Sequence, residues 1–195
     1  MRSLFLAFSL CLGVAASAQI DRDAARYAQA VAKMNEDHAR RPGAVTEDQL
    51  AAKLPADAKS ALQRVLNGKA DAKFGPALVQ CGEAALDLAL MDDFEKVRTK
   101  LAEVAPDEAK KLGRAVGRPR FVVRGIGDFA DGYLEKFAVL FDEVLKGYDE
   151  VFGFAEFSKV RGKKLRVRVH LEPAITRPPH FAPQFPYHSE IDFPV

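Results

Sequence analysis

The sequence is poor in cysteine, contains no tryptophan and carries almost no net charge. Only two of its 195 residues are cysteines, which excludes a fold held together by many disulfide bonds. The 29 basic residues are nearly balanced by 27 acidic residues, so the formal net charge of +2 gives no indication of a nucleic-acid partner. The hydrophobic share of 48% lies near the average for globular proteins, which argues against a disordered, collagen-like or coiled-coil chain.

Several motifs that carry chemistry are also missing. The sequence contains no Gly-x-Ser-x-Gly, Cys-x-x-Cys or His-Glu-x-x-His motif, so it offers neither a serine nucleophile elbow nor a zinc-binding helix. Gly125-Ile126-Gly127 stands between a short apolar segment and a predicted helix, but Ala130 occupies the place where a dinucleotide-binding loop needs its third glycine. The sequence therefore assigns no catalytic residue and no nucleotide cofactor to this chain.

The N-terminal segment has the pattern of a secretory signal peptide. Arg2 provides a positive start, residues 4–16 form an apolar run too short to span a bilayer, and residues 16–18 fit the small-x-small cleavage signal. We expect cleavage after Ala18 and export to the periplasm or the medium, with no membrane span left in the product. The alternative is a retained membrane anchor. Cleavage removes Cys11 and one basic residue, which leaves Cys81 as the single cysteine and a net charge of +1.

Residues 19–117 are predicted to form an all-helical region, because short amphipathic segments alternate with proline and glycine. The predicted helices cover residues 20–40, a short segment capped by Thr46 with Gln49, a segment beginning at Pro55, residues 75–104, and a last helix from Pro106 to near Gly117. Cys81 lies among apolar residues of the fourth helix. We expect its thiol to be buried and unreactive; a reactive or intermolecular thiol is the alternative.

Residues 118–195 have a different pattern. Residues 121–123 predict a short buried strand, Asp128 is the expected N-cap of a long helix ending at Phe152, and the alternation in residues 164–172 predicts a second strand. A strand, a helix and a strand in this order predict a β-α-β unit with parallel strands. The aromatic and aliphatic side chains of the long helix form one stripe, which we expect to pack on the sheet rather than line a ligand pocket. Its members are Phe129, Tyr133, Phe137, Leu140, Phe141, Val144, Tyr148, Val151 and Phe152.

Six of the 11 prolines fall in residues 173–195, so this segment cannot be a regular helix, although residues 188–193 could form a last strand. The predicted fold class is therefore α+β and mostly helical: an N-terminal helical bundle followed by a small β-α-β unit with a proline-rich C-terminal extension. The predicted organisation is a signal peptide in residues 1–18, a helical region in 19–117 and a β-α-β domain in 118–195.

Two groups of residues are candidate binding sites. If residues 188–192 are extended, His188, Glu190 and Asp192 share one face, and with His180 they form a candidate zinc or hard-metal set. The alternative is the polar outer face of an edge strand. The second group is a basic run with Lys163, Lys164, Arg166 and Arg168, which could bind an acidic polysaccharide or a phospholipid surface. The alternative, which we favour, is a solvated strand protected by its charge.

Residues 119–171 resemble the N-terminal part of secreted gluzincin-type zinc metallopeptidases. The resemblance rests on Phe121-Val122-Val123, on the long helix up to Phe152 followed by Gly153-Phe154, and on the alternating strand Leu165 to Val169. In that superfamily these pieces precede the helix that carries the zinc-binding motif. The resemblance implies a zinc cofactor and a peptide or protein substrate for the full-length protein, but no position here matches the catalytic motif, so no catalytic residue is carried over.

The C-terminal residues Ile191 to Val195 are apolar and strand-like, which is unusual for a natural terminus and suggests a fragment. We therefore expect an exported protein that forms the N-terminal portion of a zinc-metallopeptidase-like protein. One alternative is a non-enzymatic extracytoplasmic binding or assembly domain. Another is a small exported metal-binding protein that uses the histidine and carboxylate group.

Overall fold

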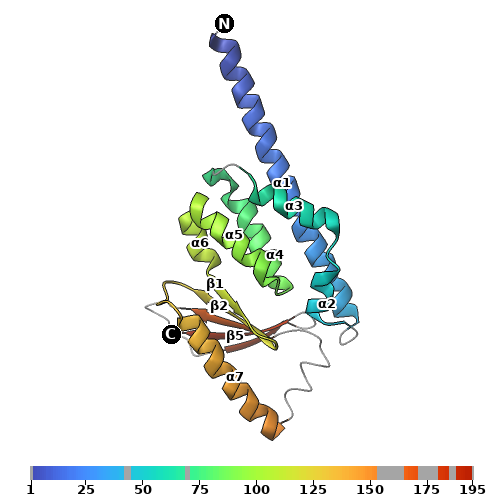
Figure 1. The fold of residues 1–195 in the computed structure, drawn as a ribbon, viewed down its shortest axis with the longest axis vertical. Helices are drawn as coiled ribbons and strands as arrows, with labels where there is room; N and C mark the ends of the chain where they lie inside the picture. The colour runs from blue at the N-terminus through green and yellow to red at the C-terminus, as the bar shows by residue number, and fades with distance from the viewer. Residues whose placement is uncertain are drawn as a thin grey trace.

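The computed structural model describes residues 2–41, 45–68, 71–152, 165–170, 180–184 and 188–194, with the side chains of residues 17–41, 45–68, 71–152 and Val167. The predicted fold class is confirmed. An N-terminal group of helices lies on one side of a sheet, and a single long helix lies on the other side (Figure 1).

The helical group contains six α-helices and one 3-10 helix among the described residues. They are α1 (Arg2–Arg40), α2 (Glu47–Ala52), α3 (Ala56–Leu66), η1 (Ala72–Phe74), α4 (Gly75–Asp87), α5 (Met91–Val104) and α6 (Pro106–Leu112). The start signals act as predicted: Thr46 and Gln49 form a reciprocal capping box at α2, and Pro106 stands in the first turn of α6. The part of α1 before residue 17 projects beyond the other helices (Figure 1).

Helix α4 lies at the centre of this group and packs against both α1 and α5. The core between these helices contains Tyr27, Leu78, Phe94 and Leu101, none of which is more than 1% exposed. At the rim of this core, the guanidinium of Arg64 donates two hydrogen bonds, of 2.9 and 2.8 Å, to the buried carboxylate of Asp23. These bonds lower the pKa of Asp23 and tie α3 to α1.

Two predicted helix boundaries are wrong. The single helix expected over residues 75–104 is two helices, because the chain turns at Ala89, which has a φ of 53°. The last helix ends at Leu112 instead of near Gly117, and Gly113 has a φ of 78° that L side chains rarely adopt. Residues 114–117 then form a strand, so the region up to residue 117 is not entirely helical.

Within the described residues, the sheet has five strands in the order β1-β2-β3-β5-β4. The strands are β1 (Arg114–Gly117), β2 (Phe121–Ile126), β3 (Leu165–His170), β4 (His180–Gln184) and β5 (His188–Pro194). Strands β2 and β3 are parallel and are joined through α7 (Tyr133–Phe152), which confirms the predicted β-α-β unit. The predicted last strand is β5, which lies parallel to β3, whereas β4 is an antiparallel edge strand that the sequence did not predict.

Helix α7 forms the second core with the sheet. Leu134, Ala138 and Leu145 are buried against a cluster that contains Phe121 and Val167. The rings of Phe121 and Phe141 meet edge to face at 5.1 Å. The helix begins at Tyr133, so the predicted N-cap at Asp128 is wrong; the residues before it form a turn whose Phe129 carbonyl accepts a 2.7 Å hydrogen bond from Arg114 of β1.

The expectation that the whole apolar stripe of α7 packs on the sheet is also wrong. Leu134, Ala138 and Leu145 are buried against the sheet, and Tyr133, Phe137 and Phe141 of the stripe are partly buried beside them. The rest of the stripe on α7 is exposed among the described residues. The stripe residues left exposed are Leu140, Val144, Tyr148, Val151 and Phe152.

We expect Gly113→Ala to destabilise the fold strongly. A Cβ at this position would lie 2.2 Å from the carbonyl oxygen of Gly125, and the residue has a φ of 78°. Because the clashing atom belongs to the backbone of β2, the strain cannot be relieved by a side-chain rotation, and the free energy of unfolding should fall by about 2 kcal/mol or more. Chemical denaturation measures the difference. Lys110→Ala, on the exposed surface of the preceding helix, is the matched control and should change the stability by less than about 0.5 kcal/mol.

Candidate functional site

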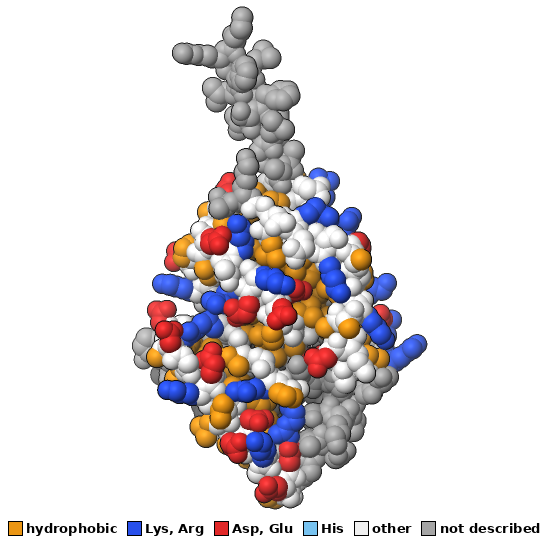
Figure 2. Space-filling model, viewed as in Figure 1, with side chains coloured by type: hydrophobic (Ala, Val, Ile, Leu, Met, Phe, Trp, Pro, Cys, Tyr) orange, Lys and Arg blue, Asp and Glu red, His pale blue; other side chains and the backbone are white. Residues whose placement is uncertain are grey.

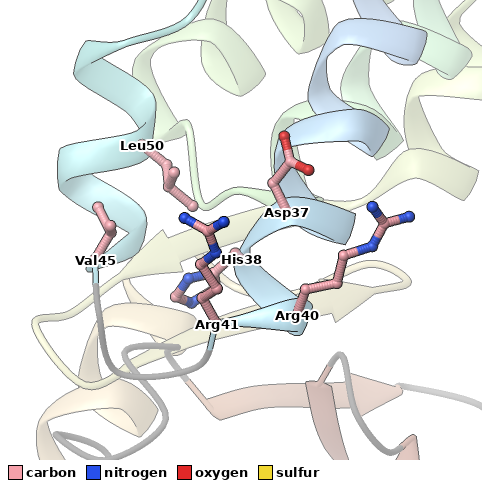
Figure 3. A pocket seen from close by; sticks show the side chains of 6 residues that line it. All are labelled: Asp37, His38, Arg40, Arg41, Val45 and Leu50. Carbon is pink, nitrogen blue, oxygen red and sulfur yellow. The ribbon is translucent and has the colours of Figure 1, made fainter.

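The described residues enclose a cavity of about 360 Å³ at the end of α1. Figure 3 shows His38 and Arg41 between Val45 and Leu50 on one side and Asp37 and Arg40 on the other. The lining residues are Asp37, His38, Arg40, Arg41, Val45 and Leu50. None of these residues is a candidate site residue in the sequence. The run His38 to Arg41 before Pro42-Gly43 is the sequence feature that could have indicated a pocket here.

This cavity has mixed chemistry. Two arginines favour an anion, but the carboxylate of Asp37 and the C-terminal end of the α1 dipole both oppose one. Arg40 also lies 3.9 Å from Glu36 in an exposed ion pair. The buried His38 and Glu47 both interact with other residues, so neither is an unpartnered polar group that would indicate a ligand. The lining residues that the structure describes include no serine, threonine, cysteine or lysine.

The candidate metal residues lie on strands β4 and β5. Their register pairs His180 with Asp192 and Ala182 with Glu190, and it pairs Gln184 with His188. Opposite residues in an antiparallel pair share a face, so all four candidates belong to one face of the sheet. His188 stands four strand positions from the His180–Asp192 pair, which is about 13 Å along the strands.

The same face contains the basic residues of β3. Arg166 is paired with Glu190 and Arg168 with Asp192, so each predicted metal carboxylate has an arginine as its neighbour on the next strand. This alternation of charges favours cross-strand ion pairs over both a metal site and a free anion-binding face. The side chains of the candidate metal residues and of Arg166 and Arg168 lie outside the described ones, as do the residues Lys163 and Lys164. The metal set and the anionic-ligand set therefore stay predictions. Among the residues searched, no group of three metal-ligating side chains occurs.

The face that carries the charged residues of β3 and β5, which we call the charged face, continues onto β2 at Arg124. The side chain of Arg124 is described. Its guanidinium donates hydrogen bonds of 3.0 and 2.7 Å to the carboxylate of Glu83 on α4 and one of 3.0 Å to the Leu112 carbonyl. By the strand register Arg124 lies beside Arg168. The described end of the charged face therefore connects the sheet to the helical group.

Cys81 is buried in the helical core, as predicted. Burial raises the pKa of its thiol to about 12, and the nearby carboxylate of Asp93 adds to the effect. The same carboxylate accepts a 3.1 Å hydrogen bond from the hydroxyl of Tyr27, whose pKa is raised mainly by burial. A thiol that stays protonated at neutral pH is a poor nucleophile, so this cluster has a structural role.

Comparisons with protein-family models, with curated proteins and with solved structures found no match to this chain. In the described part of the chain, no helix has both the length and the hydropathy to span a bilayer.

We expect Cys81 to resist thiol reagents in the folded protein. At pH 8 its reaction with Ellman's reagent should be slower than that of a free thiol by orders of magnitude, because little thiolate forms and the side chain is 0% exposed. The reaction should become fast in concentrated guanidinium chloride, which provides the total thiol count as the internal control. Rapid labelling without denaturant would contradict the burial.

Proposed function

We propose that this chain is exported and forms the N-terminal portion of a zinc-metallopeptidase-like protein. In this role its helices and sheet are a scaffold, and the zinc-binding helix follows in a longer chain. Zinc held by that later helix would supply an activated water molecule, and this chain would supply the scaffold on which the site is built. The observation that carries the proposal is the parallel β2–α7–β3 unit, extended by β5 at its far side.

Export is supported by the position of the expected cleavage site. Ser17 is half-buried, Ala18 and Gln19 are exposed, and Ile20 is the first described residue of α1 that is buried in the helical core. Cleavage after Ala18 would therefore remove the projecting part of α1 and leave the core contacts in place (Figure 1).

The peptidase-like role is supported by the apolar positions that the strand register places on one face of the outer strands. On the α7 side the strand register places Ile191 and Phe193 of β5, and Phe181 of β4, at the same face as the buried Val167. Helix α7 packs mainly over β1 and β2. A further amphipathic helix would cover the apolar positions of β5 and β4, and this is the place in the chain order at which the resemblance implies the zinc-binding helix.

We expect the exported protein to begin at Gln19. N-terminal sequencing of protein from the periplasm or medium tests this, with Ala18→Tyr as the variant that should block cleavage because the site needs a small residue. Asp21→Asn, an exposed change close to the same site, is the matched control and should leave processing intact. Protein that is exported with its original N-terminus would contradict the signal-peptide part of the proposal.

We also expect the reading frame to continue beyond Val195 and to encode a His-Glu-x-x-His helix with a downstream glutamate. The longer protein should then bind one zinc ion per chain and hydrolyse an unfolded protein such as casein, and Glu→Gln in that motif should abolish hydrolysis without loss of zinc. An in-frame stop codon directly after codon 195 would contradict the peptidase part of the proposal. The non-enzymatic binding or assembly domain would then be the function to test.

A further inference from the structure

All the large hydrophobic side chains that are exposed among the described residues lie on one helix, α7. Helix α7 is on the outside of the molecule, on the side of the sheet away from the helical group (Figure 1). Figure 2 shows hydrophobic and charged side chains intermixed in the lower part of the molecule, where α7 lies. Such a concentration of apolar surface on a single element indicates an interaction site rather than scattered exposure.

The flank of α7 that begins with the partly buried Tyr133 and Phe137 and continues through exposed residues has the spacing of a helix-pairing seam. Its residues follow one another at intervals of four and three, which is the heptad pattern of two packed helices. These residues, which we call the α7 seam, are Tyr133, Phe137, Leu140, Val144, Gly147 and Val151. Leu140 is 64% exposed, Val144 is 44% exposed, and a Cβ added to Gly147 would meet no neighbouring group within 4 Å.

We propose that the α7 seam binds a second copy of this chain, with the two α7 helices antiparallel. In a two-fold antiparallel pair each residue faces a residue at the opposite end of the seam, with the centre near residues 142–143. Leu140 then packs against Val144 of the other copy, and the large ring of Phe137 faces Gly147, where no side chain limits the approach. The paired seam is about 27 Å long.

Charge complementarity favours this partner and this orientation. Lys136 and Glu150 flank the seam at its two ends, both are exposed, and neither forms an ion pair with another described residue. An antiparallel pair brings Lys136 of each copy next to Glu150 of the other. A parallel pair would place Lys136 beside the aromatic Phe141, so Lys136 and Glu150 would not pair with each other across the interface.

One contact opposes the pairing. Glu143 lies at the centre of the seam border and would face Glu143 of the second copy. Lys146 of the same helix offsets this repulsion, because its Nζ lies 2.7 Å from the Glu143 carboxylate. Since the seam is a single exposed helix flank, we expect a weak dimer, with a dissociation constant in the micromolar range.

The dimer does not depend on the proposed function, because it uses only α7, and it is tested on the processed protein at the length that its gene encodes. Sedimentation velocity over a dilution series should show a concentration-dependent dimer. Leu140→Glu combined with Val144→Glu should yield a monomer, because both changes put carboxylates into the seam. Val139→Glu is the matched control: it adds a carboxylate at a 52% exposed position on the other flank of α7 and should leave the dimer intact.

Charge reversal tests the orientation. Lys136→Glu should weaken the dimer about tenfold or more, and adding Glu150→Lys should restore it, because the two charges exchange places across the interface. Circular dichroism should show the same fold for all variants, since every changed side chain is exposed. A protein that stays monomeric at about 100 μM overturns the proposal, as does a dimer that is unaffected by the seam variants. Failure of the double charge reversal to restore the dimer overturns the antiparallel orientation.

Discussion

The rest of the structure depends on β2, which is buried on both faces. Val122 belongs to the core of the helical group, while Phe121 and Val123, on the opposite face, belong to the core formed with α7. A strand that fills two cores holds the two layers in a fixed relation, because its side chains alternate by geometry between the faces. The hydrogen bonds from Arg124 to Glu83 and Leu112 add a polar connection on the helical side. The two regions that differ so clearly in composition are therefore one packed unit at β2.

This constraint explains which parts of the fold could be predicted from the sequence. The capping box of Thr46 and the alternation in residues 165–170 are local signals, and the structure agrees with both. Strand β1 could not be found in this way, because residues 114–117 have no periodic pattern and become a strand only by pairing with β2. Helix α4 ends before Ala89 for a similar reason: the surrounding core favours two packed helices over one long helix. Neither proline nor glycine marks that position.

The candidate sites show the limit of reasoning from residue type alone. His180, His188, Glu190 and Asp192 look like metal ligands when they are read along the chain, because histidine and carboxylates recur at strand spacing. The register adds Arg166 and Arg168 as neighbours of the two carboxylates, and this information is present only in the strand pairing. The basic run and the acidic strand, which the sequence presented as two separate sites, are adjacent in the sheet. Cross-strand ion pairs on this shared face are therefore an alternative to both predicted binding sites, which stay predictions.

The α7 seam and the apolar positions of β5 and β4 lie at different places on the α7 side of the sheet. A β-α-β crossover is right-handed, and this places the α7 seam toward β1, whereas the apolar positions of β5 and β4 lie beyond β3 at the other edge. Tyr133 and Phe137, which begin the seam, pack at the rim of the core that also includes Val116 of β1. A helix placed over β5 and β4 would therefore not contact the seam, and a dimer through the seam would not contact β5 or β4. The two proposals, a longer chain that covers β5 and β4 and a dimer through the α7 seam, are consequently compatible. Each uses a surface that the other leaves unchanged.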